Sequence, residues 1–131
     1  MKQLEKSRSA TYNIGYHIIF CPKYRRKVLT GQIEIRLKEI IRKVAIENDW
    51  EIATLDVMPD HIHVFVKATP MDSPANIVAR MKGGSSFELR KEFPYLKSRL
   101  PSLWTRSYYC ESIGSISASA ITKYIENQKA R

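Results

Sequence analysis

The sequence has 131 residues, 44% of them hydrophobic, which is the size and composition of one domain with a hydrophobic core and argues against disorder. No apolar run approaches the roughly 20 residues of a membrane helix, and the start of the sequence lacks the apolar stretch of a secretory signal. The two cysteines, Cys21 and Cys110, are expected to be buried and reduced in a cytoplasmic protein. The 22 lysines and arginines against 13 acids give a formal net charge of +9, which favours a polyanion partner such as nucleic acid and does not distinguish DNA from RNA.

The first half of the chain predicts strands around one helix. Residues 11–20 alternate and are rich in aromatic and β-branched residues, which indicates a strand, and a basic loop follows over residues 21–27. A helix is predicted over residues 32–48, because its apolar residues recur at helical spacing: Ile33, Leu37, Ile40, Ile41 and Val44. Further strands are predicted over residues 50–58 and 61–68, separated by the turn Pro59-Asp60.

The second half predicts two more helices and a strand. Ser73 and Pro74 are typical of a helix start, and this helix should reach about residue 93, with Gly83-Gly84 as a weak point where the backbone approaches a neighbouring group. A strand is predicted over residues 107–112, and a final helix from Ser115 or Ser117 to about residue 129. The order β-α-β-β-α-β plus a helix predicts an α+β, ferredoxin-like fold with an antiparallel sheet, in a single domain spanning residues 1–131.

Two histidines stand at strand spacing in the predicted strand 61–68. Side chains alternate across a strand, so His61 and His63 should share one sheet face while Ile62, Val64 and Val66 join the core on the other. Neighbouring imidazoles of this kind can bind one divalent ion. The alternative is a pair of polar residues on a solvated strand face.

Tyr124 and Gln128 stand four residues apart on the predicted final helix. At about 3.6 residues per turn they share a face. A tyrosine oxygen is a competent nucleophile toward phosphorus once its anion is stabilised, and a glutamine carbonyl can complete a two-histidine metal site without adding charge. The alternative is that Tyr124 packs in the core beside Ile121 and Ile125.

Taken together, these motifs resemble a known family. The segment Met58-Pro59-Asp60-His61-Ile62-His63 resembles the nucleases named after their histidine–hydrophobic–histidine (HUH) motif. The segment ITKYIENQ, residues 121–128, is similar to the tyrosine helix of the TnpA-type single-tyrosine transposases and their REP-associated relatives. Further similar segments are YHIIF (16–20), PKYR (22–25), KGGSS (82–86), LW (103–104) and SYY (107–109), so the resemblance covers about residues 11–128.

The resemblance implies a transposase that cleaves and rejoins single-stranded DNA at insertion-sequence ends. His61, His63 and Gln128 would hold one Mg²⁺ or Mn²⁺ against the scissile phosphate, and Tyr124 would attack to leave a 5′-phosphotyrosine and a free 3′-OH. Such enzymes recognise DNA hairpins near the element ends and act as homodimers, in many of which the two subunits share each active site. Whether Tyr124 acts within its own subunit or in its partner stays open.

Several other residues are candidates for the same site. His17 is either a third site residue or, as we favour, a hydrogen-bonded strand histidine, and Asp60 either orients an imidazole or shapes the turn. Trp104, Tyr108 and Tyr109 are candidates to stack on unpaired bases, with core packing expected for at least one. The residues predicted to contact DNA phosphates are basic: Lys23, Arg25, Arg26, Arg80, Lys82 and Arg106, with Lys97 and Arg99 as further candidates.

Two other functions remain as alternatives. A replication initiator or relaxase shares the paired histidines, but relaxases place the tyrosine near the N-terminus and add a third histidine after the pair, and this sequence has no histidine after His63. A non-catalytic ferredoxin-like nucleic-acid-binding module would present stacking aromatics on its central strands. The third strand presents His61, His63 and Phe65 there, which disfavours that reading.

Overall fold

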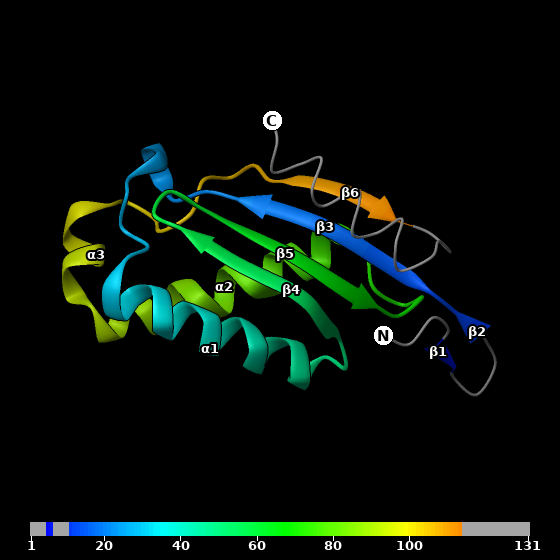
Figure 1. The fold of residues 1–131 in the computed structure, drawn as a ribbon. Coiled ribbons are helices and arrows are strands. Elements are labelled where there is room, and N and C mark those ends of the chain that lie inside the picture. The colour runs from blue at the N-terminus through cyan, green and yellow to red at the C-terminus, as the bar shows by residue number, and fades with distance from the viewer. Residues whose placement is uncertain (1–4, 7–10, 114–131) are drawn as a thin grey trace.

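The computed structural model describes residues 5–6 and 11–113, and Figure 1 shows their arrangement. A small antiparallel pair of strands comes first, β1 (Glu5–Lys6) and β2 (Thr11–Tyr12). The main body consists of β3 (Ile14–Phe20), the 3-10 turn η1 (Lys23–Arg25), α1 (Gly31–Glu47), β4 (Glu51–Met58), β5 (His61–Ala68), α2 (Pro74–Glu92), α3 (Pro94–Arg99) and β6 (Tyr109–Ile113).

The four longer strands form one sheet in the order β4-β5-β3-β6, and every neighbouring pair is antiparallel. This order confirms the predicted ferredoxin-like sheet, in which each helix connects two strands that have a third strand between them. Figure 1 shows α1 and α2 together on one side of the sheet. The predicted C-terminal helix, with Tyr124 and Gln128, lies outside the described residues.

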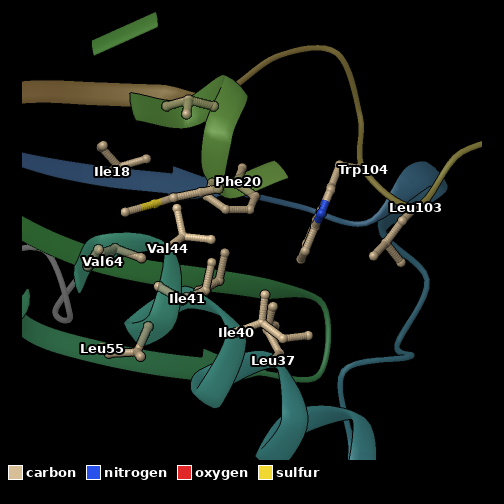
Figure 2. Packing of buried hydrophobic residues seen from close by; sticks show 14 of the residues in the cluster. Ile18, Phe20, Leu37, Ile40, Ile41, Val44, Leu55, Val64, Leu103 and Trp104 are labelled. Atoms are coloured by element: carbon tan, nitrogen blue, oxygen red, sulfur yellow. The ribbon is translucent and has the colours of Figure 1, made fainter. Parts of the chain in front are cut away.

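The core lies between the sheet and the two long helices. The apolar stripe predicted for α1 is buried throughout, and Figure 2 shows Ile41 and Val44 of α1 on the side of the helix that faces the strands of Val64 and Leu55. On β5, Ile62, Val64 and Val66 have no exposed surface, while His61 and His63 are half-buried on the other face. The predicted division of β5 into a core face and a histidine face is therefore confirmed.

Helix α2 begins as the sequence predicts. Ser73 adopts an extended backbone and its Oγ accepts a hydrogen bond of 3.1 Å from the Asn76 amide, with Pro74 in the first turn where its missing N–H costs nothing. The helix continues through Gly83 and Gly84 without a break. The expected close approach is at Gly84, where an added Cβ would lie 3.0 Å from Val44 Cγ2 of α1. Gly84 therefore lets the two long helices pack closely.

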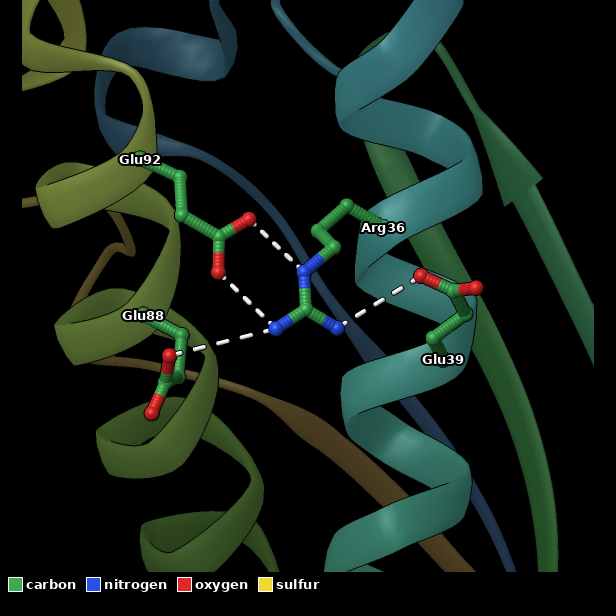
Figure 3. Close-up of polar contacts among 4 residues, drawn as sticks. All are labelled: Arg36, Glu39, Glu88 and Glu92. Carbon is green, nitrogen blue, oxygen red and sulfur yellow. Dashed lines mark hydrogen bonds and ion pairs between the residues drawn. The ribbon is translucent and has the colours of Figure 1, made fainter.

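A charged contact also joins the two long helices. Arg36 of α1 donates from Nε to Glu92 Oε1 at 2.7 Å and from Nη2 to Glu92 Oε2 at 2.8 Å, which is a bidentate pair. Figure 3 shows the same guanidinium reaching Glu88 of α2 and Glu39 of its own helix. The pair holds the end of α2, and with it the start of α3, against α1.

Three features differ from the sequence prediction. The strand predicted over residues 11–20 is divided at Asn13, and β1 pairs with its first part. The short helix α3 was not predicted; Phe93 leaves the helical region because a residue before proline is restricted to extended backbone, and Pro94 then starts a new helix. Cys21 and Cys110 are free thiols as expected, but both are half-buried rather than buried.

No helix in the described ranges has the length and apolar character that crossing a membrane requires.

Candidate active site

The two histidines lie at the end of the sheet where β5 begins. His61 is paired with Met58 and His63 with Asp56 on β4, while Ile19 of β3 lies on the other side of His63. Because His61 and His63 point to the same face, their ring centres are 4.9 Å apart. The structure therefore brings the predicted pair together on the face away from the helices.

Asp60 fixes the orientation of the first histidine. The Asp60 carboxylate lies 2.7 Å from His61 Nδ1 through its Oδ1 atom, and this hydrogen bond is the main reason that the pKa of Asp60 is below its usual value. When the neutral ring carries its proton on Nδ1, the lone pair that a metal ion needs is on Nε2. Of the two roles considered for Asp60, the contact matches the orientation of an imidazole.

Arg25 holds the same carboxylate from the other side. Its Nη2 donates to Asp60 Oδ2 at 3.0 Å, so Arg25, Asp60 and His61 form a continuous chain of contacts. The backbone of Tyr24 and Arg25 is left-handed, with φ of 61° and 50°, which turns the loop sharply at this point. The sequence marked Arg25 as a phosphate contact and gave no sign of this contact, because the two residues are 35 positions apart.

His17 lies beside the pair on β3. It is buried, and its ring centre is 5.5 Å from that of His63. Burial lowers the pKa of His17, and nearby Glu111 opposes this effect. Within residues 5–6 and 11–113, however, no three histidine, cysteine, aspartate or glutamate side chains are grouped so as to hold an ion. His17 therefore borders the pair without making it a three-ligand site.

Two backbone segments close around this end of the sheet. The amide of Lys23 donates to the Leu103 carbonyl at 2.8 Å, and the amide of Thr105 donates to the Cys21 carbonyl at 3.0 Å. The loop is tied to the histidine hairpin as well, since the Leu29 amide donates to the Pro59 carbonyl at 3.0 Å. The basic loop and the segment before β6 are thus fixed next to the histidines.

The predicted phosphate-contacting residues fall into different settings. Arg25, Arg26 and Arg106 are exposed and Lys23 is half-buried, all in the segments around the histidine end. Arg80 is exposed on α2 and donates to the Asn48 side chain, which precedes β4 and so lies toward the opposite end of the sheet. The structure therefore does not bring Arg80 together with the others.

Lys82, predicted to contact DNA phosphates, donates hydrogen bonds to two backbone carbonyls. Its ammonium donates to the carbonyls of Thr105 and Ser107, at 2.6 and 2.9 Å, and lies 5.8 Å from the centre of the Tyr108 ring. Burial lowers its pKa. Lys82 thus fastens the segment before β6 to α2.

The three aromatic candidates differ in burial, since Trp104 is buried whereas Tyr108 and Tyr109 are exposed. Trp104 belongs to the core: it packs edge-on against Phe20 with ring centres 4.7 Å apart, and its Nε1 donates to Ser85 Oγ at 2.9 Å. Tyr108 and Tyr109 are exposed, and the Tyr109 hydroxyl donates to the carboxylate of Glu111. Core packing of at least one of the three is confirmed.

Comparison with known proteins identifies the class to which this fold and site belong. The family described as "Transposase IS200 like" matches residues 10–128. The transposase TnpA of ISDra2 from Deinococcus radiodurans is 38% identical over 128 residues, covering 96% of this chain and 91% of that protein. The transposase of insertion sequence IS200 from Salmonella typhimurium is 34% identical over 127 residues, covering 95% and 83%.

Two solved structures have a fold similar to that of this chain. A crystal structure of a protein from Deinococcus radiodurans R1 described as a transposase has a TM-score of 0.77 at 36% identity, covering 95% of this chain and 97% of that one. A REP-associated tyrosine transposase bound to a REP hairpin has a TM-score of 0.60 at 16% identity, covering 92% and 68%, and shares the fold. The chain belongs to the IS200-like transposase family and is a DNA-cleaving, strand-transferring enzyme.

Proposed function

We propose that this transposase cleaves and rejoins single-stranded DNA at the ends of an insertion sequence, through a covalent 5′-phosphotyrosine on Tyr124. The observation that carries the proposal is the half-buried pair His61 and His63, with Asp60 bound to the first imidazole, in a chain of this family. Gln128 is the proposed third metal ligand.

The donor set fits a divalent ion. Two adjacent imidazoles, one of them held through Nδ1 by a carboxylate, form the arrangement that supports metal-binding histidines in proteins. An amide oxygen and the oxygens of a DNA phosphate are ligands that Mg²⁺ and Mn²⁺ prefer, and the two imidazoles would add nitrogen ligands beside them. When bound there, such an ion supplies Lewis-acid stabilisation of the charge that develops on the phosphate and on the departing oxygen.

The residues of the chain account for the remaining steps. The phenolate oxygen of Tyr124 attacks phosphorus, forming the P–O(Tyr) bond as the P–O3′ bond breaks, and the departing 3′ oxygen takes up a proton. A second 3′-OH reverses the reaction by attacking the same phosphorus and releasing the tyrosine. The number of phosphoester bonds is conserved, so the chain needs no nucleotide triphosphate.

The proposal includes the form in which the enzyme meets its DNA. The relative bound to a REP hairpin supports hairpin recognition near the element ends, and the strongly basic composition of this chain suits that partner. We propose a cytoplasmic homodimer in which Tyr124 of one subunit serves the histidine pair of the same or the other subunit. Mixing Tyr124→Phe with His61→Ala separates the two arrangements, because activity returns in the mixture only when the residues act across the dimer.

Covalent capture of DNA tests the proposal. The parent protein, incubated with Mg²⁺ and a pool of single-stranded oligonucleotides carrying hairpins, is expected to form a denaturation-resistant adduct with the 5′ phosphate of the fragment that lies 3′ of the cut. A 3′ label should therefore move with the protein, whereas a 5′ label should appear on a free fragment that ends in a 3′-OH. Tyr124→Phe should form none while still binding DNA, and Tyr108→Phe is the matched control that should form the adduct normally. His61→Ala and His63→Ala should also abolish it with the fold retained. An adduct that persists in Tyr124→Phe would assign the nucleophile to another residue.

A further inference from the structure

A pocket of about 460 Å³ lies between the loop after η1 and helix α3. Figure 1 shows α3 beyond the end of the sheet at which β5 and its histidines begin. The floor of the pocket is apolar, formed by Leu96 and Leu100, which are both buried, and by half-buried Val28. Arg90 of α2 donates to the Leu100 carbonyl at 3.3 Å and holds the end of α3 in place.

The rim of the pocket is positively charged. Arg26, Lys27 and Arg99 line it and are all exposed, and no acidic side chain is among the described residues that line it. The two carboxylates of α2 nearest in sequence to α3, Glu88 and Glu92, are directed at Arg36 of α1 instead, as Figure 3 shows. Within the described part of the chain, no carboxylate that lines the pocket neutralises the rim, which therefore suits an anionic ligand.

One wall of the pocket is an aromatic ring. Tyr95 is 46% exposed, and the ring of Phe93 supports it edge-on with ring centres 6.5 Å apart. The Arg99 guanidinium lies 6.0 Å from the centre of the Tyr95 ring. An aromatic plane beside a guanidinium, above an apolar floor, is the arrangement on which unpaired bases stack in single-strand-binding proteins.

We infer that this pocket binds one unpaired nucleotide of the DNA substrate, with the base stacked on Tyr95 and the adjoining phosphates on Arg26 and Arg99. The inference rests on the proposed function, in which the substrate is single-stranded DNA. A base within a duplex is already stacked on both faces, so the pocket selects a strand whose bases are free.

The position of the pocket links it to the histidines. Arg26 directly follows Arg25, and Arg25 touches the carboxylate that orients His61. Neighbouring Cα atoms are about 3.8 Å apart, so the rim begins one residue from the candidate active site. We expect a strand held at the histidines to continue past Arg25 into the pocket, where the bound nucleotide would fix the register of the cut.

Fluorescent oligonucleotides test the stacking. Single strands carrying 2-aminopurine at successive positions near the cleavage point are titrated with the parent protein, Tyr95→Leu and Tyr95→Trp. One position should be quenched by the parent and by Tyr95→Trp but not by Tyr95→Leu, and Tyr95→Leu should bind about 5- to 150-fold more weakly. The same strand made abasic at that position should bind the parent and Tyr95→Leu equally.

Salt dependence tests the phosphate-binding role of the rim. Arg99→Gln should reduce the slope of log K against log salt by about 0.7 for each phosphate of the single strand that the variant no longer neutralises. Arg42→Gln, which removes the same charge from an exposed position of α1, is the matched control and should leave both this slope and the quenching unchanged; an equal change of slope in the two variants would contradict a phosphate-binding role for Arg99. Thermal melts of each variant confirm that the fold is retained.

The outcomes separate the two proposals. If the parent binds and cleaves single strands but Tyr95→Leu weakens intact and abasic strands equally, or does not weaken either, the pocket does not bind a base, and the proposed function stands. If the parent shows neither binding nor cleavage of single strands, both proposals are wrong.

Discussion

Asp60→Asn is expected to weaken metal binding while leaving the shape of the site unchanged. The Asp60 carboxylate contacts His61 Nδ1 at 2.7 Å, and asparagine keeps the size of the side chain but loses its charge. Removing such a partner of a metal-binding histidine costs about 10- to 100-fold in metal affinity, or about 1.4–2.7 kcal/mol. The assay is the Mn²⁺ concentration that gives half-maximal adduct formation at saturating DNA, with calorimetry of Mn²⁺ binding as a readout independent of activity.

Arg25→Gln provides the graded comparison. Its side chain is 68% exposed, and exposed ion pairs contribute about 0.2–1 kcal/mol, so its loss should shift the Mn²⁺ requirement by no more than about 5-fold. Arg25 is also a proposed DNA contact, so both variants are compared only after DNA saturation is verified. An unchanged Mn²⁺ requirement in Asp60→Asn, or a larger shift in Arg25→Gln, would refute the role of this contact chain in metal binding.

Two further predictions concern the packing of α1 against α2. Gly83→Ala should raise the free energy of unfolding by about 0.8–1 kcal/mol, because nothing lies within 4 Å of the added Cβ. Gly84→Ala should raise it less or lower it, because its Cβ would lie 3.0 Å from Val44 Cγ2. Equal urea midpoints for the two variants would contradict this difference. Arg36→Gln should lower the melting temperature near neutral pH and much less in acid. The hydrogen bond from Arg36 holds the pKa of Glu92 below its usual value. The stabilisation by this pair is therefore complete above the unfolded pKa of about 4.3 and is lost as pH falls through the lower folded pKa. A difference in melting temperature between variant and parent that does not depend on pH would count against this contribution.

Periodicity was sufficient to predict the main elements. The predicted helix over residues 32–48 is Gly31–Glu47, because its apolar spacing matches one buried face, and the cap at Ser73 starts α2 where expected. The two-residue strands β1 and β2 are too short to produce a pattern. The helix α3 has six residues and starts at Pro94, directly after the point where the preceding helix was predicted to end, so it is too short to show a helical period of its own.

The candidate site was predicted in part. Strand alternation placed His61 and His63 on one face because it depends on local geometry. The contact of Arg25 with Asp60 joins distant parts of the chain, and no local pattern encodes it. The charge of Lys82 suggested DNA, but sequence cannot show which backbone carbonyls an ammonium will meet after folding. Tyr124, Gln128 and the bound ion stay predictions.

Because side chains alternate along β5, formation of the hydrophobic core also determines the direction of the two imidazoles. Ile62 and Val64 enter the hydrocarbon interior only when the neighbouring histidines project the opposite way, so a slip of one position would bury the imidazoles and expose the aliphatic side chains. Burial of these aliphatic side chains therefore also fixes the register that places His61 and His63 on the opposite face. A residue inserted in the tight turn at Pro59-Asp60 is therefore expected to impair both catalysis and folding, whereas a change at half-buried His61 or His63 should leave the core packing intact.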